Sequence, residues 1–113
     1  MRGRITLNKR LVLEGPVRAP DGAGGFSEQW QEFGIIWAEV TPRTGRERGG
    51  EAVSLSVTGF RITVRAAPQG APSRPRAGQR FRDGGRLFRI EAVTERDAQA
   101  RFLTCFATEE VVP

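Results

Sequence analysis

The stretch Phe60-Arg61-Ile62-Thr63-Val64-Arg65 alternates apolar and polar residues without interruption. Successive side chains of a β-strand point to opposite faces, so this period of two predicts a strand with its apolar members in the core and its arginines outside. Upstream of Gly59, the residues Val53, Leu55 and Val57 carry the same alternation. This part of the chain therefore predicts a β-fold rather than a helical one.

Strands are predicted on both sides of this stretch. They are Leu11-Val12-Leu13, Phe26–Val40, Gln79–Arg82, Arg86–Val93 and Arg101–Ala107. Gly15-Pro16 is expected to end the first strand, with Val17 as a candidate to resume it, and Asp83-Gly84-Gly85 is expected to form a hairpin turn. About six antiparallel strands separated by turns predict an all-β fold, a small barrel or sandwich with long loops.

The segment Phe26–Val40 is long for a strand. Trp30, Phe33 and Trp37 are spaced three and four residues apart, which also suits a helix, but the aromatic and β-branched content favours a strand. Gly34 is placed where a bulge would let so long a strand bend. We expect the second half of the segment to be the more buried, and most of the seven Phe and two Trp residues of the chain to lie in the core.

Two segments are predicted to be long loops within a single domain that covers residues 1–113 and begins with an extension at 1–9. Thr41–Glu51 is polar and glycine-rich, and one short helical turn within Arg46–Ser54 is the most plausible exception to the all-β pattern. Ala66–Gly78 contains three prolines and two glycines, which excludes regular secondary structure.

The composition argues against an enzyme. The 113 residues include no His and one Cys, so imidazole bases, His ligands, CxxC metal sites and an internal disulfide are all ruled out. No catalytic, cofactor-binding or metal site is predicted, and none of the Gly-Gly pairs is part of a phosphate-binding loop. No apolar run is long enough for a membrane span, and no secretory signal is present, so we expect an intracellular protein with Cys105 reduced.

The basic residues are almost all arginine and are unevenly spread. Of 18 Lys and Arg residues only Lys9 is a lysine, and the formal net charge is +5. Between positions 61 and 89 there are eight arginines and a single acid, Asp83, whereas 11–60 and 90–113 are net acidic. Such a patch suits a DNA backbone or an acidic protein partner, and a genomic bias toward Arg codons is an alternative source of the excess. A partner-facing or solvated surface is favoured, because the aromatics that would stack on bases are expected in the core.

Several motifs, taken in order and spacing over residues 10–110, resemble one family. They resemble the tailed-phage head-tail joining family, the small head-closure (stopper) or adaptor proteins of siphophage-type particles. The motifs are Arg10–Val17, Trp30, Ile36–Val40, Gly45-Arg46-Glu47, Phe60–Arg65, Arg82–Ile90 and Arg101–Cys105. The extension at 1–9 and the long segment Ala66–Gly78 depart from the family pattern.

The resemblance implies a structural virion protein without cofactors. It implies a homo-oligomeric ring of six or twelve copies, with the portal or adaptor above, the tail below and packaged double-stranded DNA in the channel, assembled in the bacterial cytoplasm. It also implies that the loop Thr41–Glu51 faces the channel as a gate. The residues expected to meet DNA or supply mobility there are Arg43, Gly45, Arg46, Arg48, Gly49 and Gly50.

A ring of identical subunits needs two different contact faces. We expect a basic face comprising Arg61, Arg65, Arg74, Arg76, Arg80 and Arg82. It would meet an acidic face of the neighbour that includes Glu91, Glu95 and Asp97 together with Glu109 and Glu110. The alternatives are a tail-terminator or tail-completion ring and a small basic nucleic-acid-binding barrel. The particle could be a phage, a prophage remnant or a gene transfer agent.

Overall fold

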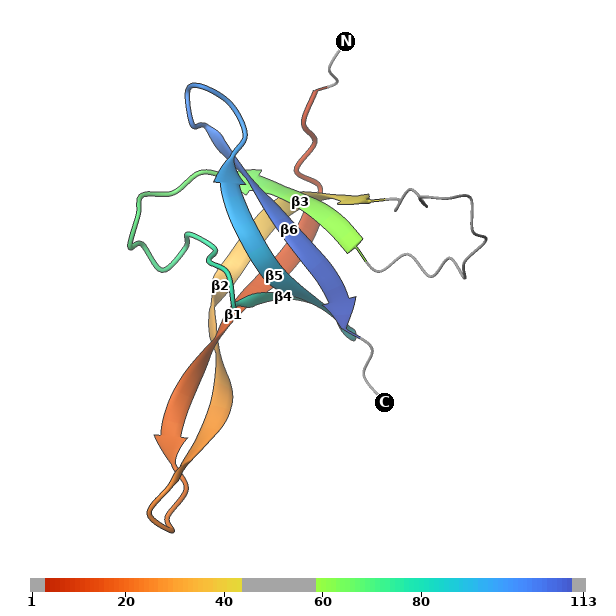
Figure 1. Cartoon of the computed structure of the whole chain (residues 1–113). Helices are drawn as coiled ribbons and strands as arrows, with labels where there is room; N and C mark the ends of the chain where they lie inside the picture. Colours follow the sequence, from red (N-terminus) through yellow and green to blue (C-terminus); the bar gives the residue numbers. More distant parts are fainter. Residues whose placement is uncertain (1–3, 44–58, 111–113) are drawn as a thin grey trace, which may run out of the picture.

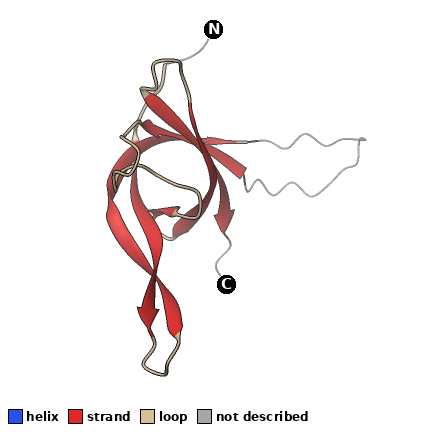
Figure 2. Cartoon of the chain, turned by 60° about the vertical axis from the view of Figure 1, so that its left-hand side comes forward, coloured by secondary structure: helices blue, strands red, loops and turns tan. Residues whose placement is uncertain are grey.

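Six antiparallel strands close into one barrel. The computed structural model describes residues 4–43 and 59–110. The strands are β1 (Lys9–Pro20), β2 (Phe26–Pro42), β3 (Gly59–Arg65), β4 (Arg80–Asp83), β5 (Arg86–Glu95) and β6 (Phe102–Glu110). Their order around the barrel is β1-β2-β3-β6-β5-β4, with β4 returning to β1 (Figure 1). The predicted all-β class is confirmed, and Figure 2 looks into the closed ring of strands.

The barrel interior is filled by the inward-facing residues of all six strands. The rings of Phe60 and Phe88 meet edge to face with centroids 5.0 Å apart. A barrel of this strand number has an interior just wide enough for side chains, so it is a packed core and not a channel. The core residues are Leu11, Leu13, Ala38, Phe60, Ile62, Val64, Phe81, Phe88, Ile90, Leu103, Cys105 and Ala107.

The hairpin of β1 and β2 extends well beyond the barrel. The last pair between β1 and β4 is Glu14 with Arg80, and the first pair between β2 and β3 is Ala38 with Val64. We call residues 15–33 the arm, which projects from the barrel as a two-stranded ribbon (Figures 1 and 2). Along the arm, each strand has its hairpin partner on one side and no further strand among the described residues on the other.

A bulge separates the arm from the barrel. Leu13 pairs with Gly34 and Glu14 with Glu32, which leaves Phe33 as the extra residue. Gly34 has a φ of 134°, a backbone conformation that residues with a Cβ rarely adopt. The bulge expected near Gly34 is therefore confirmed, and it marks the point where the hairpin leaves the barrel.

The predicted end of the first strand at Gly15-Pro16 is wrong, because β1 continues to Pro20. Beyond Glu14 this strand has a neighbour on one side only, where a residue without an N–H is tolerated. The Phe33 ring packs so closely over Gly15 that a Cβ there would overlap it. Both residues that suggested a break thus suit an edge strand passing under an aromatic ring.

The expectation that most aromatics lie in the core is also wrong. Phe60, Phe81 and Phe88 are buried, whereas Phe26 is 60% and Trp37 52% exposed. The remaining Phe and Trp residues are half-buried. Within residues 4–43 and 59–110 no second layer covers Phe26 on the arm, and Trp37 occupies an outward position next to the inward-facing Ala38. The second half of β2 is nevertheless the part that contributes to the barrel.

The other local predictions divide into confirmed and untested ones. The hairpin of β4 and β5, with its turn at Gly84-Gly85, is confirmed, as is the irregular segment Ala66–Gly78. The alternation at Val53–Val57 and the helical turn within Arg46–Ser54 lie outside the described residues. A search of the described part of the chain finds no helix with the length and apolar character that crossing a membrane requires.

Candidate assembly site

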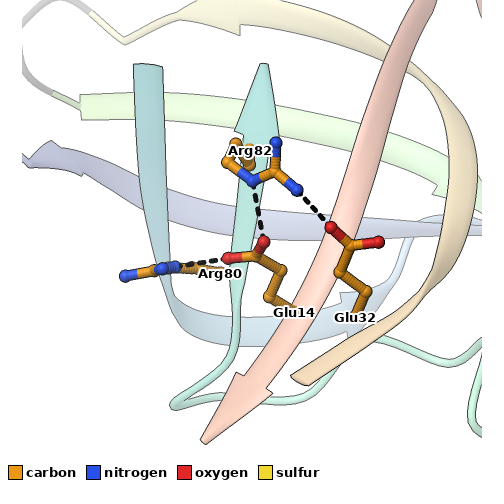
Figure 3. A network of polar contacts seen from close by, with 4 residues as sticks. All are labelled: Glu14, Glu32, Arg80 and Arg82. Atoms are coloured by element: carbon orange, nitrogen blue, oxygen red, sulfur yellow. Dashed lines mark hydrogen bonds and ion pairs between the residues drawn. The ribbon is translucent and has the colours of Figure 1, made fainter. Parts of the chain in front are cut away.

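A charged network ties the root of the arm to the barrel (Figure 3). Glu14, at the last β1–β4 pair, accepts a hydrogen bond from Arg80 Nε to its Oε1 at 2.8 Å. Its Oε2 accepts a second bond from Arg82 Nε at 2.7 Å. Arg82 Nη2 in turn donates to Glu32 Oε2 on β2, at 2.6 Å. Two arginines of β4 therefore bridge both strands of the arm at its base.

Glu14 is the buried centre of this network, with its side chain only 6% exposed. Burial by itself would raise the pKa of Glu14, but the hydrogen bonds and charges of Arg82 and Arg80 outweigh it and hold that pKa below its ordinary value. A buried carboxylate is tolerated only when its oxygens are paired in this way. The ionised Glu14 therefore holds β1 and β4 in register at the point where the arm begins.

Arginine–aromatic contacts continue along one face of the arm. The guanidinium of Arg80 lies over the Trp30 ring at 4.0 Å from its centroid, and that of Arg18 lies over Phe26 at 4.5 Å. Trp30 is opposite Pro16 on β1, and Phe26 is opposite Pro20. These contacts cover part of each ring and stiffen a ribbon that would otherwise rely on one row of backbone hydrogen bonds.

The tip of the arm is an ordered turn. Asp21 Oδ1 accepts hydrogen bonds from the backbone N–H groups of Ala23 at 2.8 Å and Gly25 at 3.0 Å. These bonds hold the pKa of Asp21 below its ordinary value. Gly22 and Gly24 have φ values of 82° and 86°, which glycine adopts without strain. The arm thus ends in a defined shape that carries a negative charge.

The six arginines predicted to form one basic face fall into three groups. Arg61 and Arg65 are exposed on the outer surface of β3, and Arg76 is exposed in the loop before β4. Arg74 is half-buried and donates to the Ala67 carbonyl at 2.9 Å. Arg80 and Arg82 bond within the chain at the arm root, as described above. The exposed basic surface is therefore smaller than the sequence suggests.

The predicted acidic face divides in the same way. Glu91 and Glu95 are exposed on β5, while Asp97 Oδ1 accepts the Arg101 N–H at 2.9 Å inside a turn. Glu109 accepts two hydrogen bonds from Arg86 at 2.9 Å. Glu110 lies 3.9 Å from Arg89. Of these five acids, only the carboxylates of Glu91 and Glu95 have no hydrogen-bond or ion-pair partner among the described residues.

The predicted start of the channel loop at Thr41 is wrong, because Thr41 and Pro42 belong to β2 and pair with Arg61 and Phe60 of β3. Arg43 is the one residue of this loop beyond β2 that the structure describes. Its backbone N–H donates to the Gly59 carbonyl at 2.8 Å, and its guanidinium lies 5.5 Å from the Phe106 centroid. This places it at the end of the barrel where β2 stops. The other members of the predicted gate lie outside the described residues: Gly45, Arg46, Arg48, Gly49 and Gly50.

Sequence reasoning did not single out the arm or its Glu14 root. One signal was available, because predicted strand residues lie on both sides of the turn Asp21–Gly25, at Leu11–Val17 and at Phe26–Val40, as in a hairpin. Glu14 and Glu32 carried no comparable signal, because the arginines that bind them lie 66 and 50 positions away in the chain.

An open groove with a mainly apolar lining lies between Ile35–Trp37 of β2 and the end of β3 with the loop that follows it. Its volume is about 440 Å³, and we call it the groove. Ile35 and Trp37, about half exposed, belong to its wall. The complete lining is Leu7, Ile35, Ile36, Trp37, Arg65, Ala66, Ala67 and Ser73. No cluster of three or more His, Cys, Asp or Glu residues able to hold a metal occurs in the described ranges 4–43 and 59–110.

Cys105 is predicted to be inert in the folded protein. It is fully buried in β6, and burial raises the pKa of its thiol to about 12. Because the thiolate is the reactive form, we expect no labelling by a maleimide at neutral pH under native conditions and stoichiometric labelling in denaturant. Mass spectrometry of both samples measures this. Complete native labelling within minutes would contradict the buried position.

The comparisons with known proteins give one family. The model of the phage head completion proteins matches residues 3–110. The chain belongs to the phage head completion protein family. It is therefore a structural virion protein, and the role of the family is not catalytic. None of the curated proteins is a significant match.

Two solved structures resemble this head completion protein along nearly its whole length. A chain of the virion of a native gene transfer agent particle is 56% identical, covers 99% of this chain and 100% of its own, and superposes with a TM-score of 0.76. The solution structure of a Shigella flexneri 2a protein is 21% identical, with 91% and 92% coverage and a TM-score of 0.67, which shows the shared fold.

Proposed function

We propose that this head completion protein forms a ring beneath the portal, closes the DNA channel after packaging and presents a docking face to the tail. The observation that carries the proposal is the 56% identity, over 99% of the chain, to a component of a gene transfer agent virion. At that identity the fold and the contact surfaces are expected to be shared. Partners in the particle would be the portal or adaptor above and the tail protein below.

The surface supports assembly through two different faces. The exposed basic residues Arg61, Arg65 and Arg76 lie on β3 and the following loop, and the exposed acids Glu91 and Glu95 lie on β5. Identical subunits in a closed ring meet through such unlike patches. The proposed basic–acidic contact is therefore narrower than a face that includes Arg80, Arg82 and Asp97, whose side chains already bond within the chain.

The channel-facing part of the proposal concerns the segment that follows β2. Arg43 stands at its start, at the rim of a rigid barrel, and Arg46 and Arg48 follow in the sequence. Arginine side chains in a narrow channel would attract DNA phosphates within about 10 Å at ordinary salt. A polar, glycine-rich segment held by a rigid scaffold suits a gate.

Deletion of the gene in a particle-producing strain tests this function. We expect heads that package DNA but fail to retain it and that carry no tail, because the channel has neither a seal nor a docking face. The amount of nuclease-protected DNA measures DNA retention, and negative-stain images show whether tails are attached. A plasmid copy of the gene should restore both DNA retention and tail attachment. Tailed, DNA-filled particles from the deletion strain would refute the proposal. Heads that keep their DNA beside free tails of irregular length would favour the tail-terminator role instead.

A further inference from the structure

We infer that the arm of one subunit docks its tip into the groove of the next subunit, an inference that rests on the ring proposed above. The arm is structurally incomplete by itself. An isolated two-stranded ribbon is marginally stable in water and gains stability when a further surface covers it. Phe26, at the start of β2, is 60% exposed even though Arg18 covers one side of its ring. The arm thus presents an exposed aromatic side chain near its tip, on a ribbon that is stiffened by the arginine–aromatic contacts.

The groove has the shape and chemistry to receive such a side chain. Its volume of about 440 Å³ falls within the range of about 300–1,000 Å³ seen for pockets that enclose small organic ligands. Ile35 and Trp37 leave about half of their surface exposed beside it. Large apolar side chains that converge on an open pocket are the usual receptor for a buried aromatic in a protein interface.

The occupant must come from another copy, because the arm cannot reach its own groove. Phe26 lies nine residues before Ile35 on the same strand, β2. At ~3.3 Å per residue the two are about 30 Å apart along an extended ribbon. In Figure 1 the arm points away from the barrel, and its root is held there by Glu14, Arg80 and Arg82. A tip-to-groove contact therefore joins unlike surfaces of two copies, the head-to-tail arrangement that closes into rings.

Charge favours the same pairing. The tip half of the arm carries Asp21 and Glu28 against Arg18 alone, so it is net acidic. Arg65 lines the groove, and the exposed Arg76 belongs to the loop between β3 and β4, which also contributes Ser73 to the lining. Opposite charges around an apolar contact steer the two surfaces together and set their register.

Cross-linking within the particle tests the contact directly. Ser27 lies next to Phe26 on the arm and Ser73 lines the groove, and both are exposed. In particles assembled from the Ser27→Cys, Ser73→Cys variant, a bis-maleimide should join successive subunits into a ladder of multimers on a denaturing gel. Cys105 is buried and does not interfere. Each single-cysteine variant should remain monomeric on the gel.

A second pair of cysteines controls for position. Gly85 is in the β4–β5 turn, at the opposite end of β5 from the groove, and has open space around it. The Ser27→Cys, Gly85→Cys pair should give no ladder, and a ladder from this pair instead would overturn the inference. Tailed particles whose Ser27→Cys, Ser73→Cys subunits stay monomeric would overturn the docking and leave the ring function intact. Absence of the wild-type protein from particles would overturn both the docking and the ring function.

Competition between a variant and the wild-type protein for incorporation into particles gives an independent measure of the contact made by Phe26. Phe26→Ser removes the aromatic side chain from an exposed position, so the monomer should fold normally. Truncating an aromatic hot spot weakens a contact by about 30-fold or more. When the variant and the wild type are co-expressed, we expect at least about 30-fold depletion of the variant in particles relative to the lysate. Ser27→Ala, on the adjacent residue, should show no depletion, and equal incorporation of the two variants would contradict the role of Phe26.

Discussion

Replacing Arg80 and Arg82 together by Glu is expected to remove a large part of the stability of the folded protein. Each arginine donates a charge-assisted hydrogen bond to the buried Glu14, and each such bond contributes about 1.5–3 kcal/mol. The substitution removes both and places two further carboxylates beside Glu14, with Glu32 nearby. The loss, before any repulsion is counted, is about 3–6 kcal/mol, and a domain of this size has a total stability of only about 5–15 kcal/mol.

Circular dichroism during heating measures this result, and the chain offers a matched control. Arg61→Glu, Arg65→Glu makes the same change of charge on two outward residues of β3, which form no ion pair with an acid in the described part of the chain. We expect the control to keep a sharp thermal transition close to that of the wild type. A comparable transition in the Arg80→Glu, Arg82→Glu protein would contradict the account of the arm root. Substitution of Arg80 and Arg82 is therefore a test of folding, whereas Arg61 and Arg65 are the positions at which to test assembly.

Glu14→Ala should lower the free energy of unfolding by about 3 kcal/mol, the lower end of the cost of breaking a buried ion pair. The lower end applies because Arg80 and Arg82 have side chains 18% and 33% exposed and regain some water. Urea unfolding measures the change. Glu32→Ala is the control, because Glu32 is 63% exposed and exposed pairs contribute about 1 kcal/mol or less. Equal effects of the two variants would contradict the central position of Glu14.

The stabilisation that Glu14 contributes depends on pH. The folded protein holds the pKa of Glu14 below its ordinary value of 4.5, so near and below that value the unfolded state binds more protons. The stabilisation is therefore fully present above the unfolded pKa and is lost as the pH falls through the folded pKa. The difference in stability between wild type and Glu14→Ala should be largest at neutral pH and smaller at about pH 3. A difference that grows with acidity would show that Glu14 is not held as a carboxylate.

The strands of the barrel were predictable because their burial follows from local alternation. Phe60–Arg65 contributes every second residue to the core, and the same alternation places Arg80 and Arg82 on one side of β4 with Phe81 on the other. The bulge at Gly34 was predictable too, because a long strand that joins two differently directed parts needs a residue free to bend. These features depend on neighbours in the chain.

The arm was not predictable because it depends on what lies beside a strand. Pro16 is incompatible with a central strand and compatible with an edge, and the sequence does not show which of the two β1 becomes after Glu14. The burial of Glu14 likewise comes from β4, which is distant in sequence. The exposure of Trp37 follows from the phase of β2 after the bulge, which apolar content does not reveal. The predicted gating role of the loop Thr41–Glu51 stays a prediction.

A reconstruction of the purified particle, computed without imposed symmetry along the head-tail axis, tests the central claim most directly. We predict density for this chain as a closed ring directly below the portal or adaptor, with the barrel walls around the channel and the segment after Arg43 directed inward. Placement of the same chain in the capsid shell, along the tail tube or at the far end of the tail would contradict the account.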